Sequence, residues 1–172
     1  MKSTLAAVLL SQRFQMSVCG WLARKFVSAT RKWYRYSPAF LTDMQAVARP
    51  NYAYCMLNAA LLAKSLGLRR ISAIEFGVAG GNGLAFMVNF AKDIERATGV
   101  EVECFGFDTG EGMPPPENKL DLPYWFQSKM YHMDKPKLAQ AGLLDKIVIG
   151  NVAETVPRFV AERKPAPIGA IT

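Results

Sequence analysis

The sequence is poor in the residues that build metal sites and disulfide frameworks. It has one histidine, His132, and three cysteines, Cys19, Cys55 and Cys104. Three cysteines that lie far apart argue against a disulfide framework and against a zinc site, so we expect reduced, mostly buried thiols in a cytoplasmic protein. The sequence identifies no nucleophile or carboxylate partner for His132. We therefore assign no catalytic residue and no metal ligand.

Long apolar runs are also absent. No stretch approaches the roughly 20 apolar residues that a membrane-spanning helix needs. The apolar run at residues 5–10 is shorter than the apolar core of a secretory signal peptide. These two absences predict a soluble chain.

Acidic residues are missing from the first 42 residues, which contain seven lysines and arginines, whereas the remainder has 14 residues of each sign. The net charge of +7 therefore belongs to the N-terminal segment. Aromatic and aliphatic residues lie between the basic ones, as in an amphipathic helix on an anionic membrane surface. A presequence, or a helix that packs on its own domain or on a partner subunit, fits the same pattern. No nucleic-acid motif accompanies the charge, so no nucleic-acid partner is expected.

A glycine-rich turn between two apolar segments is the most informative feature. Residues 71–76 predict a strand, the turn begins at Gly77, and residues 102–107 predict a second strand that ends in Asp108. A strand, a glycine turn, a helix and a strand tipped with an acid are how a doubly wound α/β domain holds a nucleoside-bearing cofactor. The sequence therefore predicts an α/β fold with a Rossmann-like, doubly wound parallel sheet.

The charge of Glu75, two residues before Gly77, discriminates between cofactors. A carboxylate at this point repels the pyrophosphate of NAD but stabilises a cofactor whose adjacent end carries an ammonium and a sulfonium. S-adenosylmethionine has that character. Asp108 is placed to accept hydrogen bonds from both ribose hydroxyls.

Three segments resemble class I S-adenosylmethionine-dependent methyltransferases, and within that class the macrocin O-methyltransferase-like group. They are IEFGVAGGNG at residues 74–83, FGFDTGEGMP at residues 105–114 and IGNVAETVP at residues 149–157. The resemblance implies that the loop at the methionine end of the cofactor contains Glu75, Gly77, Ala79, Gly81 and Gly83.

The resemblance also implies that Asp108, with Thr109 beside it, binds the ribose, and that Asn151 lies near the adenine amine. The family often has an aspartate at this last position, and asparagine still offers its carbonyl oxygen as an acceptor. Gly110 departs from the aromatic residue common in related sequences. The implied reaction is O-methylation of a small-molecule or sugar hydroxyl.

Residues 167–172 predict a fourth parallel strand at the end of the sequence. A methyltransferase of this class has about three further strands, and a parallel strand is normally buried on both faces. We therefore expect a sheet that is incomplete at its C-terminus, in a chain truncated to the cofactor-binding half. The resemblance implies that the acidic cluster for a divalent metal such as Mg²⁺ would lie beyond it. An exposed strand edge favours association, so a homo-oligomer stays open.

The domain organisation expected is a basic amphipathic extension at residues 1–36 and a cofactor-binding domain at residues 37–172. In the latter, residues 37–50 predict a connector, 51–66 a helix capped by Asn51 and stopped by Gly67, and 84–98 a helix ended by Gly99. Further along, residues 137–144 predict a short helix, 146–150 a third strand and 155–163 a helix opened by Thr155 and Pro157.

Residues 109–123 contain three consecutive prolines and predict a lid or an acceptor wall. The aromatic cluster that follows it suits either a planar or glycan acceptor or a local core. Three functions stay open: a methyltransferase, which the motifs favour, an NAD(P)-binding oxidoreductase, and a noncatalytic binding or scaffold protein.

Overall fold

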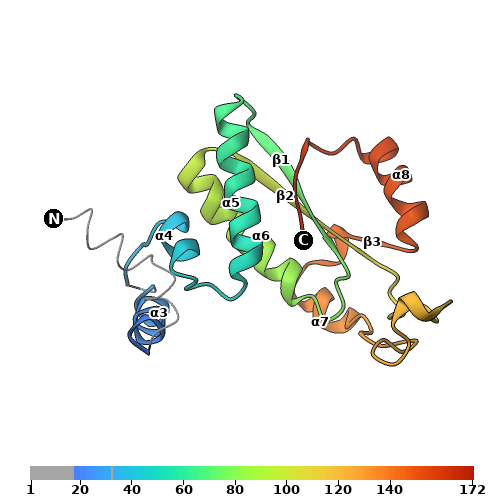
Figure 1. Cartoon of the computed structure of the whole chain (residues 1–172). Helices are drawn as coiled ribbons and strands as arrows, with labels where there is room; N and C mark the ends of the chain where they lie inside the picture. Colours follow the sequence, from blue (N-terminus) through green and yellow to red (C-terminus); the bar gives the residue numbers. More distant parts are fainter. Residues whose placement is uncertain (1–17, 32) are drawn as a thin grey trace.

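The computed structural model describes residues 18–31 and 33–172, in which helices cover both faces of one parallel sheet (Figure 1). The apolar run at residues 5–10 lies outside the described residues. In chain order the elements are α3 (Val18–Thr30), α4 (Pro38–Asp43), α5 (Pro50–Ser65), β1 (Arg70–Phe76), α6 (Asn82–Thr98), β2 (Glu101–Asp108), η1 (Lys119–Asp121), α7 (Lys135–Gln140), η2 (Leu144–Lys146), β3 (Ile147–Ile149), α8 (Val152–Arg163) and β4 (Ile168–Ile171).

The four strands are parallel and lie in the order β3-β2-β1-β4. This is the order of the first four strands in the doubly wound fold, so the predicted Rossmann-like α/β class is confirmed. In the register, Ile74 of β1 lies beside Phe105 of β2, and Glu75 lies beside Gly106. The carboxyl ends of the two central strands therefore meet at the same edge of the sheet, where ligands bind in this fold.

Alternate side chains of the central strands enter two different cores, because successive residues of a strand point to opposite faces. Ile71 and Val102 belong to the cluster beneath α5 and α6. Ile74 and Phe107 belong to the cluster beneath α8, where Phe159 packs against them. The Phe107 and Phe159 rings meet edge to face, with centroids 5.2 Å apart. Both faces are thus covered, which explains why the strands are apolar on both sides.

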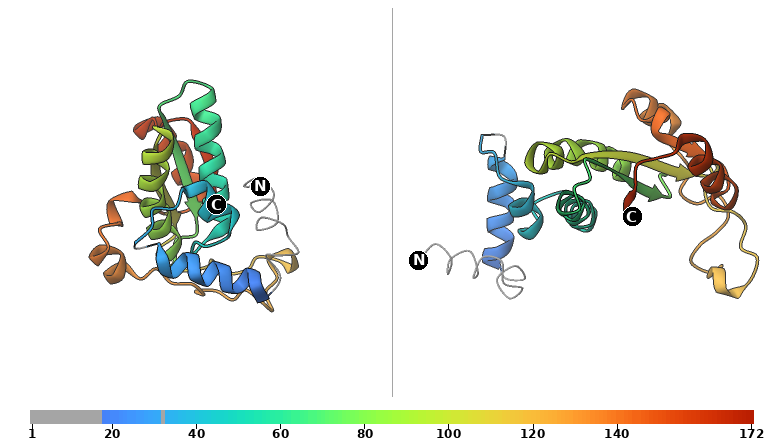
Figure 2. Two further views of the ribbon diagram at one scale, coloured as in Figure 1. Left: turned by 90° about the vertical axis from the view of Figure 1, so that its left-hand side faces the viewer. Right: turned by 90° about the horizontal axis from the view of Figure 1, so that it is seen from above.

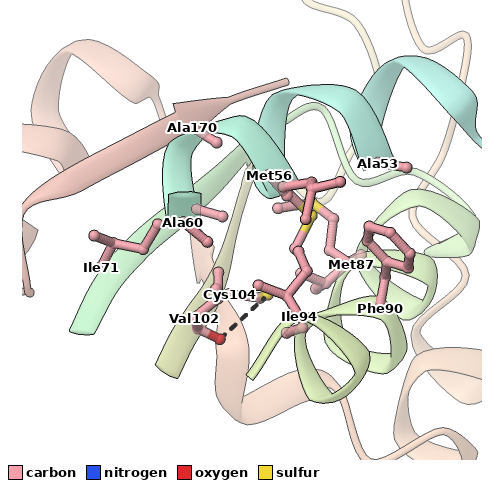
Figure 3. Packing of buried hydrophobic residues seen from close by; sticks show 14 of the residues in the cluster. Ala53, Met56, Ala60, Ile71, Met87, Phe90, Ile94, Val102, Cys104 and Ala170 are labelled. Atoms are coloured by element: carbon pink, nitrogen blue, oxygen red, sulfur yellow. Dashed lines mark hydrogen bonds between the residues drawn. The ribbon is translucent and has the colours of Figure 1, made fainter. Parts of the chain in front are cut away.

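The larger core fixes the position of α6 (Figure 3). Met56 of α5 and Met87 and Ile94 of α6 are fully buried there. Burial of each such side chain contributes about 1.5–3 kcal/mol. The helix ends at Gly99, whose φ of 77° suits glycine at a helix C-terminus, as predicted. This packing holds the first turn of α6 at the carboxyl end of β1.

The cysteines are free, as predicted, but only one is buried. Cys104 lies in the core, and burial raises the pKa of its thiol to about 12, so it stays protonated at neutral pH. Cys19 and Cys55 are exposed, so the expectation of mostly buried thiols is wrong for these two. Every helix within the described ranges is too short or too polar to span a bilayer.

The two helices that precede β1 differ from the prediction: α4 was not predicted, and α5 begins one residue earlier than expected. Residues 38–43 form α4 inside the predicted connector, and the Ser37 hydroxyl caps it by accepting a hydrogen bond from the Phe40 backbone N–H at 3.1 Å. α5 begins at Pro50, so Asn51 is not its N-cap. Proline suits the first helical position because its fixed φ matches the helix and its missing N–H is not needed there. Gly67, with φ of 75°, follows the end of α5 as predicted.

Two later helices also begin earlier than predicted. α7 begins at Lys135, because the Asp134 carboxylate accepts a hydrogen bond from the Lys137 backbone N–H at 3.1 Å. α8 begins at Val152 and is capped by Asn151, so Pro157 lies inside the helix and does not open it. The side chains of Asp134 and Asn151 therefore set these boundaries.

The N-terminal part forms a separate layer at one end of the molecule. The inner face of α3 packs on α4 and the segment after it through Val27, Leu41, Met44 and Ala46. Figure 2 shows α3 lying across this end, with the segment that contains η1 at the opposite end. The basic helix predicted for the extension is thus present at residues 18–30.

Candidate functional site

The turn between β1 and α6 contains backbone conformations that require glycine. Gly77 and Gly81 have φ angles of 88° and 76°, in the left-handed region where a Cβ is strained. Gly83 has no such angle, yet a Cβ on it would overlap the carboxylate of Glu75. The lack of a side chain at this position is therefore what allows Glu75 to lie against the first turn of α6.

Glu75 is a buried acid, and only one of its two carboxylate oxygens has a hydrogen-bond partner among the described residues. Its side chain is only 3% exposed, and its Oε1 accepts a hydrogen bond from the Tyr52 hydroxyl at 2.9 Å. Its Oε2 has no hydrogen-bond partner among the described residues. A buried carboxylate oxygen without a partner is costly, which marks this position as one that a ligand can complete.

Burial, and to a smaller extent the negative charge of Asp108, raise the pKa of Glu75, while Tyr52, Arg49 and the nearby Leu84 backbone N–H act in the opposite direction. Arg49 lies over the Tyr52 ring, with 5.1 Å between the guanidinium carbon and the ring centroid. The positive end of the α6 dipole also favours the ionised form. Glu75 thus combines a low-dielectric position with specific support for its negative charge, and this combination is typical of functional acids.

Asp108 holds the glycine turn in place. Its Oδ2 accepts hydrogen bonds from the backbone N–H groups of Val78 and Ala79 at 2.8 and 2.9 Å, and its Oδ1 accepts one from Gly110 at 2.7 Å. A carboxylate offers about four acceptor positions, so about one is left for a ribose hydroxyl. The sequence suggested a ligand role alone. In the structure the acid also ties β2 to the turn after β1, and its ribose role stays a prediction.

A cavity of about 380 Å³ opens at this edge of the sheet. Four of the predicted residues line it: Gly77, Ala79, Asp108 and Thr109. The other lining residues are Phe107, Gly112, Met113, Pro114, Tyr131 and Val152. A mostly apolar pocket with a few polar groups is the usual form of a small-molecule site. Residues 112–114 and Tyr131 belong to the predicted lid and the aromatic cluster after it, so these segments do form a wall beside the turn.

Glu75, Gly81, Gly83 and Asn151 do not line this cavity. The two glycines shape the turn around it: a Cβ on Gly81 would overlap Leu138 of α7. Asn151 is exposed, and its Oδ1 accepts a hydrogen bond from the Ala153 backbone N–H at 2.9 Å. This bond caps α8, so the structure gives Asn151 a clear role in the fold, and its contact with adenine stays a prediction.

Sequence reasoning missed two residues that reach the glycine turn from other elements. Tyr52 of α5 contacts Glu75, and Lys137 of α7 donates a hydrogen bond from Nζ to Asn82 Oδ1 at 2.8 Å. Both contacts join residues far apart along the chain, so no local sequence pattern predicts them. Lys137, Tyr52 and Glu75 thus lie around the N-terminus of α6.

Among the described residues, no group of three or more histidine, cysteine or acidic side chains is arranged to hold a metal ion. The Asp121 carboxylate is used within its own loop instead: its Oδ2 accepts hydrogen bonds from the backbone N–H groups of Glu117 and Asn118 at 2.7 and 3.1 Å. The Mg²⁺ site that the resemblance implies stays a prediction.

No protein-family model matches this chain. No curated protein matches it either. Among solved structures, it is similar to the crystal structure of CalS11, a calicheamicin methyltransferase, with a TM-score of 0.49 and 20% sequence identity. That alignment covers 91% of this chain and 68% of the other. At this level the similarity carries no conclusion about chemistry, and the proposed likeness to the macrocin group stays untested.

Proposed function

We propose that this chain binds S-adenosylmethionine and forms the cofactor-binding part of a methyltransferase that acts on a small-molecule or sugar hydroxyl. The observation that carries the proposal is Glu75: a buried acid beside the glycine turn, with one carboxylate oxygen unpartnered among the described residues. A positively charged group is the ligand that such an oxygen favours.

The residues around the turn suit the two charges at the methionine end of the cofactor. Glu75 would hold the ammonium, and Lys137 with the first N–H groups of α6 would hold the carboxylate. Lys137 is well placed for this, because its Nζ lies 3.9 Å from the position of a Cβ on Gly80, which belongs to the turn. The cavity bounded by Ala79 and Asp108 would receive the ribose and adenine.

When bound, S-adenosylmethionine supplies a methyl group activated by a sulfonium. The chain's own contribution is to orient the donor and to exclude water from it. Met113, Pro114 and Tyr131 wall the cavity on the side of the proline-rich segment, where an acceptor would approach. Holding both reactants in attack geometry lowers the barrier of such transfers by up to about 7–11 kcal/mol.

An NAD(P)-dependent oxidoreductase is the competing function, since a glycine turn at a helix N-terminus also suits a pyrophosphate. Glu75 disfavours it, because a pyrophosphate beside a buried carboxylate is repelled. Calorimetric titration of the purified chain separates the two. We expect S-adenosylhomocysteine and S-adenosylmethionine to bind with micromolar affinity and NADH to give no heat. Binding of NADH without binding of the other two would overturn the proposal.

The carboxylate contact has its own test. We expect Lys137→Met to weaken S-adenosylhomocysteine binding by about tenfold or more, because a hydrogen bond to a charged group contributes about 1.5–3 kcal/mol. Lys92→Met is the matched control, because Lys92 is an exposed lysine on α6 away from the turn. Equal affinities for the two variants would remove Lys137 from the site without affecting the assignment of Glu75.

A further inference from the structure

α3 has two apolar faces, and the fold uses only one. Gly20 and Val27 are buried, and Val27 packs against Leu41 and Met44. These contacts hold α3 on the rest of the chain. The expectation that the basic helix packs on its own domain is therefore correct for this inner face.

The outer face of α3 carries large apolar side chains in solvent. Val18, Leu22 and Phe26 are four residues apart and are 75%, 54% and 66% exposed, so they form one stripe along the helix. Trp21, 52% exposed, flanks this stripe. The left view of Figure 2 shows α3 lengthwise at the front of the molecule, as its outermost helix at this end. A contiguous exposed stripe of this kind marks an interaction surface.

The same part of the chain carries only positive charge. Lys25 lies on the outer face of α3, with Nζ 5.7 Å from the centroid of the Trp21 ring. Arg31 and Arg35 follow at the end of the helix and line a hollow of about 410 Å³ together with the ion pair between Arg96 and Asp93 of α6. No acidic residue lies between residues 1 and 42. An exposed tryptophan, Trp33, lies between these arginines in the sequence.

We propose that the outer face of α3, with Trp33 and the basic residues at its end, docks on an anionic membrane surface. Membrane interfaces favour helices with one apolar face, basic residues that reach the headgroups, and amphipathic aromatics at the boundary. Docking would bury Val18, Leu22 and Phe26 while it leaves the lysine and arginine charges near the phosphates. The helix lies parallel to the surface and does not cross it.

The charge and the apolar stripe together favour an anionic membrane over a second copy of the chain or a nucleic acid. A second copy of the chain would bring together two surfaces with an excess of positive charge, and like charges repel. A nucleic acid would satisfy the charge but would not bury the aliphatic stripe. An anionic lipid surface satisfies both properties at once.

The test is flotation of the purified chain with vesicles of phosphatidylcholine alone and of phosphatidylcholine mixed with phosphatidylglycerol. We expect binding to the anionic vesicles that weakens as salt increases. Leu22→Glu should reduce this binding by about tenfold or more, since it places a charge where an apolar side chain is buried. Leu120→Glu is the matched control, because Leu120 is 81% exposed in the segment at the opposite end of the molecule.

A second measurement keeps the proposal testable if Leu22→Glu does not fold. In a variant with Trp33→Phe and Trp125→Phe, the remaining fluorescence comes from Trp21, and we expect a blue shift and quenching by brominated anionic lipid. Equal vesicle binding by Leu22→Glu and Leu120→Glu would overturn the proposal, as would an unchanged Trp21 spectrum. A concentration-dependent dimer that Leu22→Glu abolishes, with no vesicle binding, would assign the face to self-association instead.

Discussion

The turn after β1 and the outer face of α3 depart in opposite ways from the usual distribution of polar and apolar side chains in globular proteins. At the turn, a carboxylate is buried where the fold alone would favour an apolar side chain; on α3, apolar side chains are exposed where the fold alone would favour polar ones. Neither arrangement helps the isolated chain to fold. Because each region is unfavourable for the isolated fold, we propose a binding partner for each: a cationic ligand beside the turn and an anionic membrane surface at α3.

The two regions also differ in how firmly they are held. Around Glu75, contacts converge from α5, α6 and β2, and Asp108 fixes the turn with three backbone hydrogen bonds. The inner face of α3 has one small cluster beneath it. Substitutions at the turn should therefore change both stability and binding, whereas substitutions on the outer face of α3 should change binding alone.

The largest effect on stability is expected at Asp108. Asp108→Ala leaves the N–H groups of Val78, Ala79 and Gly110 without their acceptor, and we expect the free energy of unfolding to fall by about 2–4 kcal/mol. Urea denaturation measures this loss. Asp145→Ala, which removes an exposed acid, is the control and should change stability by less than about 0.5 kcal/mol. Equal losses for both variants would show that Asp108 does not hold the turn.

Substitutions of two glycines near Glu75, Gly80 before α6 and Gly83 in its first turn, test the role of this acid. A Cβ on Gly83 would displace the Glu75 carboxylate, whereas the nearest atom to a Cβ on Gly80 is Lys137 Nζ at 3.9 Å. We expect Gly83→Ala to weaken S-adenosylhomocysteine binding by about tenfold, a loss of about 1.4 kcal/mol. Gly80→Ala should retain more of the affinity. The prediction fails if calorimetry finds Gly80→Ala to be the weaker binder.

The smallest effect is a gain in stability from Glu75→Gln. Because the pKa of Glu75 is raised in the folded chain, the folded state binds this proton more tightly than the unfolded state does. The stabilising contribution of the group is present at low pH and is lost as pH rises through the raised pKa. At pH 8 we therefore expect Glu75→Gln to raise the free energy of unfolding by up to about 1 kcal/mol.

This gain should shrink as pH is lowered toward the usual pKa range of glutamate. Denaturant titrations of both proteins at several pH values measure it. A variant that is less stable than the unchanged chain at pH 8 would contradict the account of a costly buried charge.

The sheet and its central helix were predictable because their signals are local. β1 and β2 are mostly apolar segments bounded by turn residues, and α6 shows a helical repeat that ends at Gly99. Helix starts failed where a side chain cap decides them, as at Asn151, whose amide oxygen caps α8. Thr155 and Pro157, which have the residue types of a helix start, predicted a start about one turn too late.

The site was predictable as a set of residues but not as a set of contacts. Glu75 and the glycines follow from sequence spacing, yet the use of Asp108 as the clamp on the turn depends on its side chain orientation. The Tyr52–Glu75 hydrogen bond depends on how α5 crosses β1. Such contacts come from tertiary packing, which a single sequence does not encode in any nearby pattern.

The charge of Glu75 is the central claim, and calorimetric titration of S-adenosylmethionine into two variants at pH 8 tests it most directly. Glu75→Gln keeps the size of the side chain and removes its charge, while Glu103→Gln removes one charge from a part-exposed ion pair with Arg70 on the same sheet. We predict that the first variant binds at least about tenfold more weakly, a loss of about 1.4 kcal/mol, and that the second binds as the unchanged chain does. Equal affinity for all three proteins would contradict the claim.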